Sequence, residues 1–359
     1  MSREHRWSIA TLVGILVLIV LFALFLGPNI LGDTPSYIQA LHVMSGGTPA
    51  ADFIPNRLLT TFGALETVRL LGAVFGGTYQ GWFFLNLILY VATVYTMYAL
   101  IRRVTGSAAA AHLGALFLAG NYGFLTFGPN FLMDIGGWSF YIFSLYFVWR
   151  YAESKSPQWI IWAAACIGIG GLIKEYAFLG GAAVAAYLIV EAVRQKRAKP
   201  IGLLVGAGII SLIPVGLLYI YIYYRFGYTY LDWLGFNAAY YTYHSRVLEY
   251  IKALGSLYNL SAIFVICGAV VIIRQWHSLS AEVRTFLIAF LVSFLPVFFW
   301  PAITQRILTI TVPFSVLVAA FFFKRYEAHA WIFKIVLVVY VLATFCMDSY
   351  LLKAINVPF

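Results

Sequence analysis

Acidic and basic residues stand at the edges of long apolar segments in this sequence. Asp33 directly follows the first apolar segment, Asp134 begins a later one, and Lys174 and Glu175 end another. A charged residue at the edge of an apolar, membrane-spanning segment costs free energy, so its presence there indicates a function. An ionised Asp at a membrane surface can accept a proton from a hydroxyl group. The alternatives are that Asp33 caps a helix and that Lys174 and Glu175 only hold helices together.

Arginines supply a second kind of chemistry. Arg57, in Ile54-Pro55-Asn56-Arg57, and Arg306, in Thr304-Gln305-Arg306-Ile307, also adjoin apolar segments. The planar guanidinium group pairs with phosphate through two parallel hydrogen bonds. Carboxylates together with Arg and Lys suit a substrate that carries a phosphate leaving group, such as a lipid phosphate delivered within the membrane. Arg306 could equally anchor a helix at the interface.

The composition shows where such chemistry takes place. Of the 359 residues, 63% are hydrophobic and 10% are charged, and the mean hydropathy is +0.89. Soluble domains carry about 25% charged residues. A chain this apolar must place its surface in lipid. The net charge of +10 lies in short clusters between apolar segments, which is typical of membrane topology and not of nucleic-acid binding.

The apolar segments predict an all-α fold, a polytopic transmembrane bundle of about eleven spans. A span needs about 20 apolar residues. We place the spans at 8–28, 80–101, 108–127, 136–150, 158–173, 177–193, 201–224, 258–273, 285–300, 307–323 and 331–350. Weaker segments between 34 and 79 are interrupted by Pro and Gly, so we expect amphipathic helices that lie on the membrane surface.

Lys and Arg predict the orientation, because positive charge favours the cytoplasmic side. A cytoplasmic N-terminus places most of the 23 basic residues in cytoplasmic connections. The extracytoplasmic side then holds two long loops, at 28–79 and 225–257. Loops of more than about 12–15 residues in a compact protein are usually functional. We therefore expect the active site of this cell-membrane protein to face away from the cytoplasm.

The sequence around Asp33 predicts a short helix. Thr34 is a good N-cap and Pro35 a good first helical residue, so the helix should run from there to about Gly46. Asp33 then lies beside the positive end of the helix dipole, which favours its ionised form.

Taken in order, these features resemble the GT-C superfamily of polytopic glycosyltransferases, which includes protein mannosyltransferases and aminoarabinose lipid A transferases. The resemblance covers roughly residues 8–195. Its elements are Gly32, Asp33 and Tyr37 as Gly-Asp-x-x-x-Tyr, Pro55-Asn56-Arg57 before a surface helix, Phe62-Gly63 or Phe75-Gly76, Arg102-Arg103 at the end of a span, an Ala-rich span from Ser107, Asp134 opening the next span, and Lys174 after a Gly-rich span.

The resemblance implies a catalytic role for two acids and a polyprenyl-phosphate-linked sugar as donor. Asp33 would be the base and Asp134 would support the site. Arg57 or Lys174 would meet the donor phosphate, and the anomeric centre would be inverted. Many relatives carry a second acid where this chain has Thr34, and Lys-Pro where it has Pro55-Asn56-Arg57.

The remaining expectations concern substrate, cofactor and domain organisation. Tyr37, Glu175, Arg306 and His244 complete the group of substrate-binding candidates. The acceptor would be a lipid, glycan or protein. No obligatory metal is predicted, although a phosphate site can recruit a divalent ion. Residues 1–195 would form the GT-C-like module, and 196–359 a variable set of helices with the aromatic loop 225–257.

Three other functions remain open at this point. A transporter or lipid-sugar flippase often has broken helices, and the glycines before Lys174 would permit one. An envelope glycan polymerase or ligase would use the loop 225–257, with Arg225, His244 and Arg246. A structural subunit would tolerate the change Asp33→Asn.

Overall fold

The computed structural model describes residues 3–25 and 27–355, and within them the chain folds into helices and contains no strand. The α-helices, in chain order, are α1 (Arg3–Phe25), α2 (Thr34–Met44), α3 (Asn56–Phe75), α4 (Thr78–Thr105), α5 (Ala108–Ala119), α6 (Tyr122–Phe127), α7 (Asp134–Ser154), α8 (Gln158–Ile173), α9 (Leu179–Gln195), α10 (Lys199–Phe226), α11 (Tyr230–Tyr240), α12 (Arg246–Tyr258), α13 (Ala262–Gln275), α14 (Ala281–Phe294), α15 (Gln305–Leu308), α16 (Val312–Arg325) and α17 (Ala330–Ile355). Short 3₁₀ turns join several of them, among them η1 (Glu175–Phe178).

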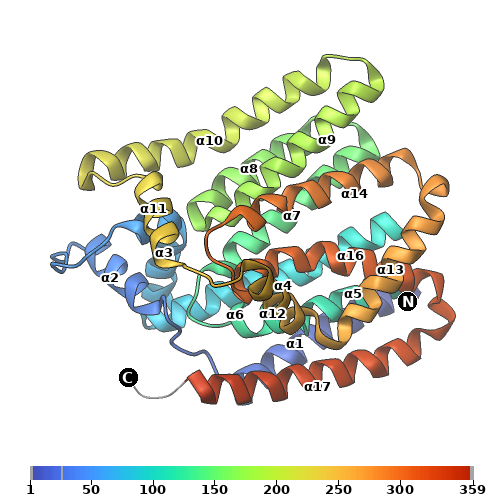
Figure 1. Ribbon diagram of the computed structural model, residues 1–359, viewed down its shortest axis with the longest axis horizontal. Helices are drawn as coiled ribbons and strands as arrows, with labels where there is room; N and C mark the ends of the chain where they lie inside the picture. Colours follow the sequence, from blue (N-terminus) through green and yellow to red (C-terminus); the bar gives the residue numbers. More distant parts are fainter. Residues whose placement is uncertain (1–2, 26, 356–359) are drawn as a thin grey trace.

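The long helices lie side by side in one bundle, with α10 along one edge and α17 along the other (Figure 1). Helices from the two halves of the chain pack on each other, since α14 packs on α9 and α16 packs on α5. The helices α2, α3 and α11 gather at the end of the bundle opposite the N-terminus (Figure 1). We call this end the site end.

The prediction of a polytopic helical bundle is confirmed. Within residues 3–25 and 27–355, nine helical stretches are long and apolar enough to cross a membrane. Eight of them coincide with predicted spans. The other three predicted spans correspond to shorter or more polar helices, which are α5 with α6, α7 and α8.

The ninth stretch, α3, changes one expectation. The segment 34–79 was predicted to hold only surface helices, yet α3 has 20 residues and a mean hydropathy of 1.4, which meets the criterion for a span. It lies beside α2 at the site end (Figure 1) and packs on α4 and α8. The contact with α4 is close, because a Cβ atom on Gly81 would stand 2.3 Å from the backbone nitrogen of Gly72.

Candidate active site

Asp33 occupies the N-cap position of α2, one residue earlier than the sequence predicted. Its side chain makes no capping hydrogen bond. The hydroxyl of Thr34 does not cap the helix either, since it accepts from the Leu31 amide at 3.0 Å and donates to the Phe131 carbonyl at 2.8 Å. The carboxylate of Asp33 is therefore left for other partners.

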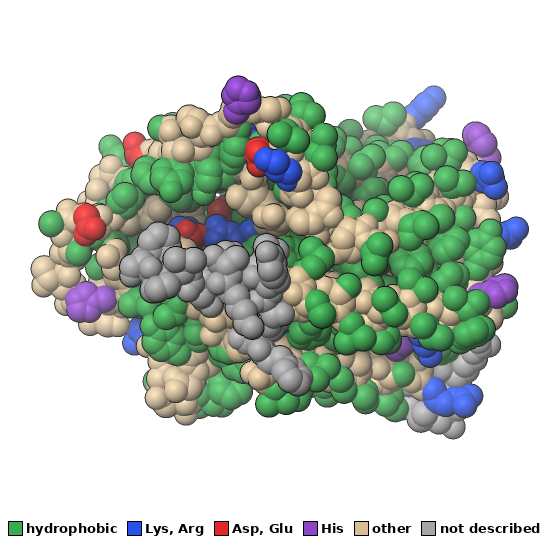
Figure 2. Space-filling model, turned by 60° about the horizontal axis from the view of Figure 1, so that its bottom comes forward, with side chains coloured by type: hydrophobic (Ala, Val, Ile, Leu, Met, Phe, Trp, Pro, Cys, Tyr) green, Lys and Arg blue, Asp and Glu red, His purple; other side chains and the backbone are tan. Residues whose placement is uncertain are grey.

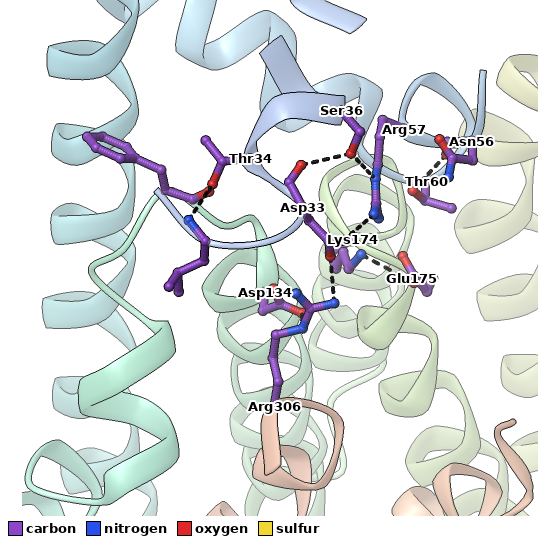
Figure 3. Close-up of polar contacts among 12 residues, drawn as sticks. Asp33, Thr34, Ser36, Asn56, Arg57, Thr60, Asp134, Lys174, Glu175 and Arg306 are labelled. Carbon is purple, nitrogen blue, oxygen red and sulfur yellow. Dashed lines mark hydrogen bonds and ion pairs between the residues drawn. The ribbon is translucent and has the colours of Figure 1, made fainter. Parts of the chain in front are cut away.

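Two arginines hold that carboxylate (Figure 3). Nη2 of Arg57 lies 2.7 Å from Oδ1 of Asp33, and Nη2 of Arg306 lies 2.6 Å from Oδ2. Arg57 comes from the first turn of α3 and Arg306 from α15, far along the chain. The arrangement unites the acid and both arginines that the sequence singled out.

Aromatic rings and a hydroxyl fix the guanidinium group of Arg57. Its central carbon lies 4.8 Å from the ring centre of Tyr37 and 5.3 Å from that of Trp233. Its Nε atom donates to the hydroxyl of Ser36 at 3.0 Å, and Ser36 in turn donates to the Asp33 carbonyl. Attraction between a guanidinium group and aromatic faces contributes about 0.5–2 kcal/mol per contact. Trp233 and Ser36 are parts of the site that the sequence analysis missed.

Asp134 lies behind Arg306, at the first residue of α7. Its side chain is completely buried, and Oδ1 lies 3.6 Å from Nε of Arg306. Arg306 thus stands between the two carboxylates, as Figure 3 shows. Because two carboxylates hold the guanidinium group of Arg306, its position is fixed. A cation in a fixed position is suited to binding a negatively charged group of a substrate.

The loop before Asp134 is tied to the rest of the site end. The amide of Asn86, in α4, donates to the Asn130 carbonyl at 2.5 Å and to the Leu132 carbonyl at 2.9 Å. The indole of Trp82 donates to Leu132 at 3.1 Å. A buried Asn in an apolar helix is the signal that would have identified this support from the sequence.

Lys174 and Glu175 lie next to this cluster but do not line its open side. Lys174 is buried, and its Nζ atom lies 3.4 Å from Oε1 of Glu175 and 5.6 Å from the ring centre of Tyr176. Tyr37 is also fully buried, under Arg57. Lys174, Glu175 and Tyr37 therefore lie behind the ionic cluster, away from the cavity.

A cavity of about 740 Å³ opens in front of Asp33. On the face drawn in Figure 2, charged side chains lie mainly at the edges and in one hollow, while hydrophobic side chains cover most of the rest. The cavity walls come from α2 and the loops around it, from the first turn of α3, and from α6, α11 and α15. The lining residues are Leu31, Gly32, Asp33, Ser36, Gln39, Asp52, Ile54, Asn56, Arg57, Tyr122, Thr126, Phe127, Leu132, Trp233, Phe236, Asn237, Tyr240, Tyr241, Thr304, Gln305, Arg306 and Ile307.

The charges around Asp33 govern its ionisation. Burial by itself raises its pKa, but the positive charges of Arg306, Arg57 and Lys174 outweigh that effect. The pKa of Asp33 falls to about 2. The residue is therefore an anion at neutral pH, although most of its surface is covered.

His244 stands apart from the other candidates. It is exposed and does not line the cavity. In the described part of the chain, no group of three or more His, Cys, Asp and Glu residues is placed to hold a metal ion. Independence of metal remains a prediction.

The fold and the ionic cluster define a multi-pass membrane protein with a charged cavity at one end of its bundle. Residues 62–220 match the family model described as Dolichyl-phosphate-mannose-protein mannosyltransferase. This family is of the GT-C type, and a helical structure with many apolar helices is consistent with a multi-pass glycosyltransferase of that type. No curated protein matches the chain.

The segment that matches the family model contains only some of the residues of the candidate site. It includes Asp134, Lys174 and Glu175, but it begins after Asp33 and Arg57 and ends before Arg306. The resemblance expected from the motifs, over residues 8–195, began earlier and stopped earlier. The roles of the residues outside the match therefore depend on the geometry of the site.

Proposed function

We propose that this glycosyltransferase moves a sugar from a polyprenyl-phosphate-linked donor to an acceptor hydroxyl, with Asp33 as general base. The observation that carries the proposal is that one ionised carboxylate and two arginines face the same cavity. A phosphate leaving group requires positive charge, and an acceptor hydroxyl requires a base. The cluster provides the base and the positive charges in direct contact with each other.

The reaction is a single displacement. The acceptor hydroxyl gives its proton to the carboxylate of Asp33, and its oxygen forms a bond to the anomeric carbon of the sugar. The bond from that carbon to the phosphate oxygen breaks, and its electron pair leaves with the polyprenyl phosphate. Because attack occurs on the side opposite the leaving group, the anomeric centre is inverted. Arg57 and Arg306 stabilise the charge that develops on the phosphate.

In the absence of a donor, Asp33 is paired with the same two arginines that would bind the donor phosphate. Both carboxylate oxygens of Asp33 are paired with guanidinium groups, and its pKa of about 2 makes it a weak base. A donor phosphate competes for the same guanidinium groups. As they turn toward the phosphate, Asp33 loses part of the charge that lowers its pKa and becomes better able to accept a proton. Deprotonation of the acceptor is thereby coupled to binding of the donor.

The orientation follows from the distribution of positive charge and remains part of the proposal. A cytoplasmic N-terminus places the site end, with Asp33, on the extracytoplasmic side. A lipid-linked donor can reach a cavity at this level sideways from the bilayer. A labelling test with a membrane-impermeant thiol reagent on single cysteines placed at Asp52 and at Lys196 would show which end of the bundle is outside.

The decisive experiment measures transfer from a panel of radiolabelled polyprenyl-phosphate sugars by the purified protein in lipid. The comparison is between the wild type and Asp33→Asn. Asp52→Asn is the matched control, since Asp52 lines the same cavity but is exposed. General base catalysis contributes about 10²–10⁴-fold, so we expect a loss of that size in Asp33→Asn alone. Equal transfer by both variants would remove Asp33 from the chemistry and direct attention to Asp134.

A further inference from the structure

The wall of the cavity that α11 forms is mainly aromatic. Trp233, Phe236 and Tyr240 line the cavity at helical spacing, together with Asn237 and with Tyr241 at the C-cap of the helix. The rings of Trp233 and Phe236 are inclined by 13° with centres 5.9 Å apart, and those of Phe236 and Tyr240 by 14° at the same separation. The three rings are therefore stacked on one another in a continuous row.

This row of rings leads from the reacting groups to the outside. Trp233, which contacts Arg57, is 7% exposed, whereas Phe236 is 46% and Tyr240 is 69% exposed. The row of rings therefore begins at the ionic cluster and becomes more exposed toward Tyr240. A bound molecule that lay along it would have one end at Asp33 and the other outside the cavity.

Unengaged amides accompany the aromatic surface. The side chains of Gln39, Asn56 and Gln305 line the cavity, and within residues 3–25 and 27–355 no hydrogen bond joins their amide groups to another residue. Each amide offers two donors and an acceptor. The cavity is thus equipped for a ligand that has an apolar face and many hydroxyl groups.

From this juxtaposition we propose that the acceptor is a carbohydrate, which stacks on the aromatic face of α11 and hydrogen-bonds to the amides of Gln39, Asn56 and Gln305. A sugar ring combines a face of C–H groups, which packs on aromatic rings, with hydroxyl groups around its edge. This inference rests on the proposed function, because it names the acceptor of the same reaction.

Two other acceptor classes fit the wall less well. A simple lipid alcohol would cover the rings but leave the amides unpaired, and unpaired polar groups in a covered site reject such a ligand. A peptide is usually recognised by adding a strand to a sheet edge or by laying a helix in a groove. The described part of the chain has no strand. A carbohydrate offers both a face of C–H groups for the rings and hydroxyl groups for the amides.

The test uses the full-length protein in lipid with one polyprenyl-phosphate-linked donor that it cleaves. Three acceptors are compared, namely a short oligosaccharide on an alkyl tail, a peptide containing Ser and Thr, and a fatty alcohol of matched tail length. We expect transfer to the oligosaccharide. Phe236→Ala and Tyr240→Ala should each raise the acceptor KM about tenfold and leave the donor KM unchanged. Phe236→Tyr, which keeps the ring, should retain the normal acceptor KM.

The control separates this surface from aromatic residues in general. Tyr224 is 83% exposed and does not line the cavity, so Tyr224→Ala should leave both KM values unchanged. Preferred transfer to the peptide or the fatty alcohol, or an unchanged acceptor KM in both α11 variants, would overturn the inference. Slow release of sugar from the donor to water, measured without acceptor, reports the proposed function separately. If that release is also absent for every donor, the proposed function fails first.

Discussion

Nη2 of Arg306 lies 2.6 Å from Oδ2 of Asp33, although the two residues stand near opposite ends of the chain. The same guanidinium group approaches Asp134, which is completely buried. Arg306 therefore has two roles. It pairs with the proposed base, Asp33, and it compensates the charge of the buried Asp134. Variants at this position can separate the two.

Removal of the Arg306 charge should reduce both stability and transfer. In Arg306→Gln the buried carboxylate of Asp134 loses this cation, and an uncompensated buried charge costs about 3–5 kcal/mol. The double variant Arg306→Gln with Asp134→Asn should regain most of the stability, because no buried charge is left over, yet it should stay inactive. Thermal unfolding in detergent measures the first effect, and sugar transfer the second. Full activity of the double variant would contradict the role of Arg306 at the phosphate.

Acid should weaken the protein through Asp33. Its pKa is about 2 in the folded protein and has an ordinary value of 3.8, so the folded state binds the proton less readily. The stabilisation is complete above about pH 4 and is lost as the pH falls toward 2, on the order of 2 kcal/mol in total. The midpoint of unfolding, followed from pH 6 to pH 2, should fall more steeply in the wild type than in Asp33→Asn. Parallel curves would show that Asp33 is not paired in solution.

Trp233 should affect the donor through Arg57. The indole lies on one guanidinium group, and its contact contributes about 0.5–2 kcal/mol. We expect Trp233→Leu to raise the KM for the lipid-phosphate donor about threefold to tenfold, and Trp233→Phe to restore most of the affinity. An effect of Trp233→Leu on the acceptor KM alone would show that this ring does not act on the donor through Arg57.

Asn86 should support the site from a distance. Its amide satisfies two backbone carbonyls in the loop that leads to Asp134. Asn86→Ala leaves those carbonyls buried and unpaired, which costs about 1–3 kcal/mol. We expect a lower unfolding temperature and a lower kcat with little change in either KM. Ser211→Ala is the matched control, because the Ser211 hydroxyl is also buried and also donates to backbone carbonyls, those of Ala164 and Ala207, but does not line the cavity. A normal kcat in Asn86→Ala would mean that the loop keeps its shape without this support.

The sequence by itself determined the environment and the reactive groups of this protein. Runs of apolar residues long enough to cross a bilayer can be recognised locally, because lipid demands them whatever the tertiary structure. The charges at their edges, among them Asp33, Arg57 and Lys174, were recognisable for the same reason, since a charge there must be compensated. The helix of α2 was also predicted, but its first residue was placed one position late.

Tertiary structure alone decided which charges meet. Arg306 was equally well explained as an interfacial anchor, and only the packing of α15 against the site end brings it to Asp33 and Asp134. His244 had the right chemistry and an aromatic loop around it, yet it is exposed and outside the cavity. The sequence does not distinguish Trp233 from the many other aromatic residues. Only the position of α11 in the fold shows that Trp233 lies over Arg57. The physical reason is that pairing of distant groups depends on the relative positions of whole helices, which a local pattern of polarity does not specify.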